Sequence, residues 1–320
     1  MPDYILALLI GCALDALIGD PEWFPHPVRF IGRYISFCEG KLRARGGNLR
    51  RGAVLLTAST VLITMAATAL LMWLLSLMGR WPLLVGMALV NWMGLSARCL
   101  AHEAVGVKRA LSSGGVEAGR RQVARIVGRD TNELTEREII CATIETVAEN
   151  TTDGVISPLL YSAIGGPVLL MGFKAASTLD SMVGYLDPKY RDIGWSSARL
   201  DDLLNYLPAR LCAVLMCLAA GMMRLDMKRA FATVRRDHAN HKSPNCAWSE
   251  AAAAGALGIL LGGTHMYFGK PVVKPTIGDD LRAPEPGDID RTNGMMFITA
   301  ALMAAAIAAI AAIAALVCLL

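Results

Sequence analysis

The chain has 320 residues, of which 54% are hydrophobic and only 18% are charged. A soluble domain is usually about a quarter charged, so this composition argues against an ordinary soluble protein. The net charge of +4 is too small to indicate a nucleic-acid-binding protein. The eight cysteines include no CxxC pair and no Cys/His spacing typical of zinc, which argues against a disulfide framework or a zinc site.

The apolar residues are gathered in long stretches. Ala53–Met78, Trp81–Ala97 and Thr292–Leu320 contain no charged residue. A helix of about 20 residues crosses the hydrocarbon core of a bilayer, so each stretch predicts a membrane helix. Tyr4–Ile18 is apolar apart from Asp15 and predicts a retained membrane helix, not a removed signal peptide. The sequence therefore predicts an all-α, polytopic integral membrane protein.

The loop that follows the first helix is strongly basic. Its cations begin at Arg29 and continue to Arg51, which predicts a cytoplasmic position by the positive-inside rule. His26 and Arg29 lie beside a proline-rich turn, where they form either a candidate ligand site or a helix-end scaffold. The next two apolar stretches predict a helical hairpin that turns at Gly79–Pro82.

Residues 98–153 are the longest polar stretch and predict a cytoplasmic helical lobe within a single integral membrane domain, 1–320. Turns are expected at 112–115 and 128–130. Thr135 followed by Glu138 predicts a capping box at the start of a helix over Leu134–Asn150.

Three later apolar segments, 155–173, 203–223 and 251–263, are interrupted by proline or glycine or are short. Whether all three span the membrane is open. We favour broken or re-entrant helices, because the polar motifs between these segments resemble parts of one site.

Three carboxylates recur at intervals of four residues. Glu145, Glu149 and Asp153 line one face if the helix continues through Asp153. Like charges on one face repel, so a cation should compensate them: Mg²⁺, Arg or Lys. A solvated acidic face is the alternative to a Mg²⁺ site shared with substrate phosphates.

Three further clusters suit anionic ligands, because each contains lysine, arginine or hydroxyl groups that can bind an anion. Each also has a structural interpretation: an interfacial lysine with a helix cap for the first, an i,i+3 pair of Arg199 with Asp202 for the second, and a basic membrane-proximal loop for the third. The first holds Lys174, Ser177, Thr178 and Asp180; the second holds Arg199, Asp202 and Arg210; the third holds Arg235, Arg236, His241, Ser243 and Asn245.

Taken in order, several motifs resemble the CobD/CbiB family, the adenosylcobinamide-phosphate synthases of cobalamin biosynthesis. These motifs are DALIGDP, GRDT, ETVAENTTDGVISPL, KAASTLDSMVGY, ARLDDLLNYLPARL and HKSPN. The resemblance covers about Leu6 to Gly269. One departure is Ser177, where the family usually has Asn before TLDS.

The resemblance implies a multi-pass inner-membrane ligase with its active site facing the cytoplasm. Such an enzyme joins (R)-1-amino-2-propanol, or its O-phosphate, to the f-side-chain carboxylate of adenosylcobyric acid, with ATP and Mg²⁺. Its partners would be these substrates, membrane lipid, and a second copy or other membrane enzymes of the pathway.

This chemistry assigns expected roles to the candidate residues. Glu145, Glu149 and Asp153 would hold the metal, and the cations and hydroxyls of the three clusters, with His26 and Arg29, would bind substrate and phosphate. The base for the incoming amine would be His241, with Asp180 and Asp202 as weaker candidates. No Walker A or GxGxxG sequence locates the ATP site. The alternative is a corrinoid-binding membrane scaffold or transporter without catalysis.

Overall fold

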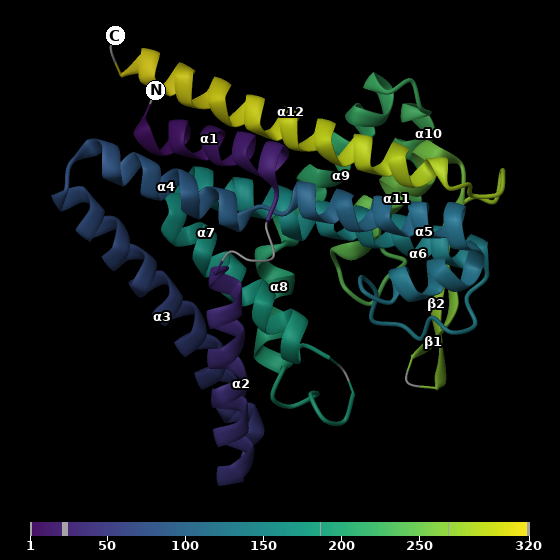
Figure 1. The fold of residues 1–320 in the computed structure, drawn as a ribbon, viewed down its shortest axis with the longest axis horizontal. Coiled ribbons are helices and arrows are strands. Elements are labelled where there is room, and N and C mark those ends of the chain that lie inside the picture. The colour runs from purple at the N-terminus through teal and green to yellow at the C-terminus, as the bar shows by residue number, and fades with distance from the viewer. Residues whose placement is uncertain (1, 21–24, 186, 268, 319–320) are drawn as a thin grey trace. The chain divides into compact units, whose positions relative to one another are not determined.

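The computed structural model describes residues 2–20, 25–185, 187–267 and 269–318, which fold mostly into helices (Figure 1). The chain forms two compact units, each assembled from separate stretches. Unit 1 contains Met1–Ser96, Ser157–Asn205 and Ala304–Leu320. Unit 2 contains Ala97–Ile156 and Tyr206–Met303, so the predicted polar lobe falls within it.

The regular elements described in unit 1 are all helices. His26 begins its second helix by accepting a hydrogen bond from the Val28 N–H, and Asn48 caps the third in the same way from Arg51. The helices are α1 (Asp3–Ile18), α2 (Pro27–Arg45), α3 (Leu49–Leu77), α4 (Arg80–Gly94), α7 (Ser157–Val183), α8 (Trp195–Leu204) and the last part of α12 (Gly287–Val317).

Helix α7 lies at the centre of unit 1, in contact with α1, α2, α3, α4 and α8. Its buried Leu170, Leu179 and Val183 share a core with Ile35 of α2 and Leu56 of α3. Gly165 and Gly166 interrupt the helix with non-helical backbone, and Gly166 has a φ of 62°, which favours glycine. The predicted break at Gly165–Pro167 is therefore present; a re-entrant path through a membrane remains a prediction.

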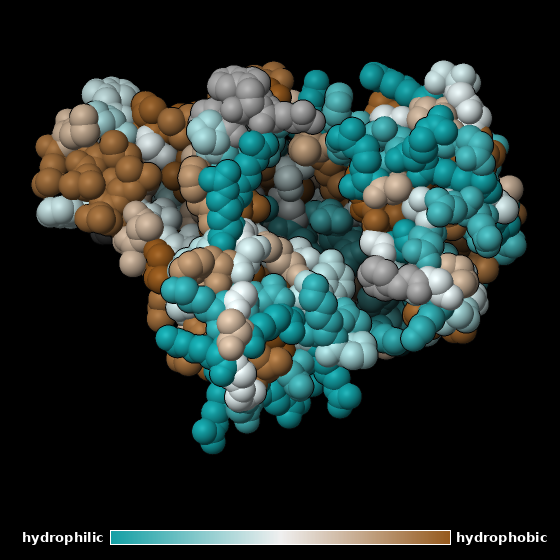
Figure 2. Space-filling view, turned by 60° about the horizontal axis from the view of Figure 1, so that its bottom comes forward, coloured by the Kyte–Doolittle hydropathy of each residue, from teal (hydrophilic) through white to brown (hydrophobic). Residues whose placement is uncertain are grey.

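Helices α3 and α4 form the predicted hairpin, and their outer surface is apolar. Leu55, Leu62 and Trp73 on α3 are 68%, 64% and 57% exposed. Figure 2 shows hydrophobic side chains gathered over the region where α3 and α4 meet, at the left of the view. Such a surface is suited to lipid and costly in water.

Four described helical segments are long and apolar enough to cross a membrane, as expected for a helical membrane protein. A fifth span is possible if α8 and α9 (Tyr206–Met222) count together as one broken helix. The four segments are Leu49–Leu77, Arg80–Val123, Glu136–Val183 and Gly287–Val317.

Unit 2 packs helices around one short buried helix, α11 (Cys246–Leu257), of which Ala251–Leu257 are all buried. Helix α5 (Ala97–Val123) lies beside α6 (Glu136–Thr151) in Figure 1 and kinks at Gly115, within the predicted turn. The predicted Thr135–Glu138 capping box is formed. The remaining elements are the π-helical turn η1 (Thr152–Ile156), α9, α10 (Met227–Asp237), β1 (Leu260–Tyr267), β2 (Lys270–Gly278) and the first part of α12 (Gly287–Val317).

The all-α prediction is wrong for Leu260–Tyr267 and Lys270–Gly278, where β1 and β2 pair as antiparallel strands. Pro271 and Pro275 argue against a strand in the sequence, because proline is typical of loops. Both strands of a two-stranded sheet are edges, however, and edge strands tolerate proline. The predicted apolar segment 251–263 accordingly ends its helix at Leu257, where Gly258 adopts a left-handed backbone.

Replacement of Gly11 by alanine is expected to destabilise unit 1. A Cβ at Gly11 would lie 2.5 Å from the Asn91 Cβ and 2.9 Å from the Trp92 backbone nitrogen, so α1 would have to move away from α4. The cost should be about 1–3 kcal/mol, measured as a lower melting temperature of the detergent-solubilised protein. Gly40→Ala is the control, since a Cβ at Gly40 meets no atom within 4 Å. An unchanged melting temperature for Gly11→Ala would contradict this packing.

Candidate functional site

A buried ion pair organises the polar centre of unit 2. The Arg129 guanidinium donates to Glu145 Oε2, and the two side chains are only 5% and 6% exposed. The Gly262 N–H donates to the other carboxylate oxygen, Glu145 Oε1, at 2.8 Å. Arg129 Nη1 also lies 3.1 Å from His265 Nε2. The pair therefore joins the loop before α6, α6 itself and the β-hairpin.

The sequence predicted that Mg²⁺, Arg or Lys compensates the acidic face of α6. For Glu145 this cation is Arg129. Both oxygens of Glu145 accept protein hydrogen bonds, so this carboxylate is already satisfied. Glu149 lies one turn further along α6, where its Oε1 is 3.0 Å from the Cys246 Sγ. Asp153 belongs to the π-helical turn, which departs from the α-helical spacing that its predicted alignment assumes.

Glu250 on α11 is a further acid of this centre, which no sequence motif predicted. It is 5% exposed, and its carboxyl makes no hydrogen bond or ion pair with the residues that the structure describes. Burial raises the pKa of Glu250 well above its usual value, and the nearby carboxylates Glu145 and Glu149 raise it further. Glu250 therefore holds a proton more readily than an exposed glutamate.

His241 lies in the loop before α11. The Ser243 N–H donates to His241 Nδ1 at 3.0 Å, which places the ring proton of the neutral imidazole on Nε2. Burial lowers the pKa of His241, and the Lys274 ammonium lowers it further, although Glu149 and Glu145 act in the opposite direction. The structure thus brings three predicted residues into one electrostatic cluster, together with Glu250 and Lys274.

Arg210 and Asn245 belong to the same unit. The Arg210 guanidinium carbon lies 3.4 Å from the centre of the Tyr206 ring and 4.7 Å from the Trp248 ring. Its Nη1 donates to Asn245 Oδ1 at 3.4 Å. Ser243 supports this loop by accepting from the Asn245 N–H at 3.3 Å.

The two predicted arginines of α10 differ in their surroundings. Arg236 is engaged by two carboxylates: its Nε donates to Asp237 Oδ1 at 2.7 Å and its Nη1 to Asp279 Oδ1 at 2.9 Å. These bonds tie α10 to the end of β2, a structural role. Arg235 is exposed.

The other predicted residues lie in unit 1. His26 Nε2 donates to the Met93 carbonyl at 2.8 Å while its Nδ1 caps α2. Burial lowers the pKa of His26, an effect that Asp20 opposes and that Lys174 and Arg29 reinforce. Thr178 Oγ1 donates back to the Lys174 carbonyl at 2.6 Å, a bond within α7. Ser177, Asp180 and Asp202 are half-buried, and Arg199 is exposed.

Four members of the unit 2 centre were not predicted from the sequence: Arg129, Glu250, His265 and Lys274. Two of them gave a usable signal: Arg129 lies in the GRDT motif, and Glu250 is an isolated acid at the start of an alanine-rich apolar run. His265 and Lys274 gave none, because their positions depend on the unpredicted hairpin.

Fold and site together define a polytopic helical membrane protein with a buried acid–base centre. Residues 8–296 match the CobD/Cbib protein family, and the chain belongs to that family. No solved structure matches it.

Curated relatives match nearly their whole length. "Cobalamin biosynthesis protein CobD" of Listeria monocytogenes is 45% identical over 90% of this chain and 92% of its own. The CobD protein of Geobacter metallireducens is 50% identical over 86% of each chain. "Cobalamin biosynthesis protein CbiB" of Salmonella typhimurium is 46% identical over 95% of this chain and 96% of its own.

The two buried acids should respond differently to amide replacement. Glu145→Gln leaves the buried Arg129 charge without its partner and should cost about 3 kcal/mol of folding free energy. Glu250→Gln should cost less, because a neutral amide resembles a protonated carboxyl. Melting temperatures of the detergent-solubilised variants test this ranking. Equal losses in both variants would contradict the protonated state of Glu250.

Stability should also depend on pH through Glu250. The pKa of Glu250 is raised in the folded state, so its contribution is complete below the ordinary value of 4.5 and is lost as the pH rises toward the folded-state pKa. The melting temperature of the parent protein should therefore fall more between pH 5 and pH 8 than that of Glu250→Gln. Parallel profiles would refute the assignment, and Glu136→Gln, an exposed acid, is the control.

Proposed function

We propose that this protein acts in cobalamin biosynthesis as a ligase that joins (R)-1-amino-2-propanol, or its O-phosphate, to the f-side-chain carboxylate of adenosylcobyric acid. The observation that carries the proposal is the match of residues 8–296 to the CobD/Cbib family, supported by relatives named as cobalamin biosynthesis proteins. The product would be adenosylcobinamide or its phosphate.

The reaction needs an activated carboxylate, because a carboxylate oxygen is a poor leaving group toward an amine. Phosphoryl transfer from ATP to the substrate carboxylate gives an acyl phosphate and ADP. The free amine then attacks the acyl carbon, the C–N bond forms, and phosphate leaves with a proton from nitrogen. The site must therefore accept one proton from the incoming ammonium and neutralise phosphate charge.

His241 suits the role of proton acceptor. Its lowered pKa keeps the imidazole neutral near physiological pH, when it can take a proton. Asp180 and Asp202, both half-buried in unit 1, stay as weaker candidates. For the phosphates we propose the exposed Arg235 of unit 2, in preference to Arg236, which is held by two carboxylates. Arg199 and Lys174 of unit 1 stay as separate candidates.

Magnesium fits this site as a companion of ATP. The structure describes no group of three or more His, Cys, Asp or Glu side chains that could hold a metal by themselves. Mg²⁺ commonly binds through one or two carboxylates together with substrate phosphates, and it would neutralise phosphate charge. We propose Glu149 and Asp153 for this role, because Glu145 is already satisfied by Arg129 and Gly262.

We further propose a multi-pass position in the cell inner membrane, with the site facing the cytoplasm. The basic α2 and the apolar surface of α3 support this orientation. Membrane lipid would then surround α3, and a second copy or another membrane enzyme of the pathway could share the bilayer.

A coupling assay on the detergent-purified protein tests the function. The mixture contains adenosylcobyric acid, Mg-ATP and aminopropanol or its O-phosphate, and mass spectrometry follows the amide product. ATP-dependent formation of the amide is expected. Corrinoid binding without product or ATP consumption would instead identify a scaffold or transporter.

The proposed metal ligands make a separate prediction. Glu149→Gln and Asp153→Asn should each lower turnover at least about tenfold and raise the Mg²⁺ concentration needed for half-maximal rate. Glu117→Gln, an exposed acid of unit 2 paired with Arg120, is the matched control. An unchanged Mg²⁺ dependence in both variants would remove Glu149 and Asp153 from the metal site.

A further inference from the structure

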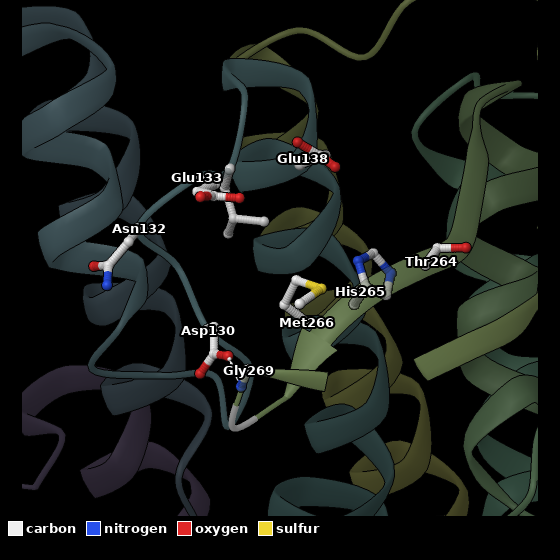
Figure 3. Close-up of a pocket in the computed structure, with 9 residues that line it drawn as sticks. Asp130, Asn132, Glu133, Glu138, Thr264, His265, Met266 and Gly269 are labelled. Carbon is white, nitrogen blue, oxygen red and sulfur yellow. Dashed lines mark hydrogen bonds between the residues drawn. The ribbon is translucent and has the colours of Figure 1, made fainter. Parts of the chain in front are cut away.

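A small cavity opens in unit 2 between the loop before α6 and the β-hairpin (Figure 3). Its volume is about 330 Å³. Ligand pockets usually range from about 300 to 1,000 Å³, so this one suits a small molecule and is too small for a corrinoid macrocycle. The lining residues are Asp130, Asn132, Glu133, Leu134, Glu138, Thr264, His265, Met266 and Gly269.

The lining is acidic. Asp130, Glu133 and Glu138 contribute three carboxylates, and no lysine or arginine is among the lining residues. The Gly269 N–H donates to Asp130 Oδ2 at 2.8 Å, and the capping box occupies Glu138 Oε2. Within the described residues, Asp130 Oδ1, Glu138 Oε1 and the whole Glu133 carboxylate accept no hydrogen bond. A ligand here would therefore carry a positive charge.

His265 adds a donor to this lining. The Arg129 guanidinium can only donate, so His265 Nε2 must accept from it, and the proton of the neutral ring lies on Nδ1. Burial and the neighbouring Arg129 lower the pKa of His265, which keeps the ring neutral. The residue is 6% exposed, and its buried Nδ1 has no hydrogen-bond partner among the described residues. Such a donor requires an oxygen acceptor.

The ligand implied by this lining is small and carries an ammonium group together with an acceptor oxygen. Figure 3 shows the carboxylates of Glu133 and Glu138 on the α6 side and the His265 ring on β1. This arrangement offers carboxylate oxygens to an ammonium and an N–H to a hydroxyl or ester oxygen. An amino alcohol has both groups.

We propose that this cavity binds the amino alcohol substrate, with its ammonium at Glu133 and Glu138 and its oxygen at His265. The inference rests on the proposed function for the identity of the ligand. It places the amine beside the Arg129–Glu145 pair, since His265 contacts both the cavity and Arg129.

The test combines binding and kinetics in the full-length, detergent-solubilised protein. The probes are (R)-1-amino-2-propanol and, in a second experiment, its O-phosphate. The compound that binds more tightly is identified as the ligand of the cavity. The double variant Glu133→Gln/Glu138→Gln removes two charges and preserves the capping box, which accepts glutamine. Glu136→Gln is the control, because Glu136 is an exposed acid that does not line the cavity.

The double variant should raise the amine Kd by calorimetry, and the amine KM, about tenfold or more, with kcat and the KM for ATP little changed. His265→Leu should weaken binding similarly, and His265→Asn, which retains a donor, should restore part of it. Wild-type amine affinity in the double variant, or an equal loss in Glu136→Gln, would overturn the proposal. If the parent protein binds the amine through these residues but forms no amide, the proposed function fails and the cavity assignment stands.

Discussion

The buried pair of Arg129 and Glu145 is the interaction on which unit 2 depends. A charge removed from water is tolerated only when its partner and its remaining hydrogen bonds are also supplied. Arg129 comes from a loop, Glu145 from α6, and the third contact, the Gly262 N–H, from the β-hairpin. These three parts must therefore meet for either charge to be buried, and the hairpin is fixed against α6 as a result.

The polar groups around this pair differ in whether they have hydrogen-bond partners. Glu145 has its full set of partners, whereas Glu250, on the buried α11, has none among the described residues. Small side chains allow this close packing: a Cβ at Gly255 would lie 2.8 Å from the Arg229 carbonyl oxygen on α10. The helix thus delivers a carboxyl into a tightly packed interior, where burial and the nearby carboxylates raise its pKa.

Amide formation from an ammonium and a carboxylate requires proton acceptors, charge compensation for phosphate and a place for a small amine. Unit 2 contains a candidate for each requirement of the proposed reaction: His241 as proton acceptor, Glu149 and Asp153 as ligands for a compensating Mg²⁺, and the acidic cavity at His265 for the amine. Unit 1 contains the apolar α3 surface and a second group of cations around His26.

The sequence by itself determined the features that depend on neighbouring residues. Long uncharged stretches predicted the α3–α4 hairpin, Gly165–Pro167 predicted the break in α7, and Thr135 with Glu138 predicted a capping box. The ordered motifs predicted the family. They also contain Glu145, Glu149 and His241, which lie close enough to interact electrostatically; their roles stay predictions. Only the tertiary structure decided which cation neutralises Glu145, that β1 and β2 pair as strands, and that His265 and Glu250 enter the centre. The physical reason is range: caps and apolar runs act within a few residues, whereas the partners of Glu145 lie 16 and 117 positions away.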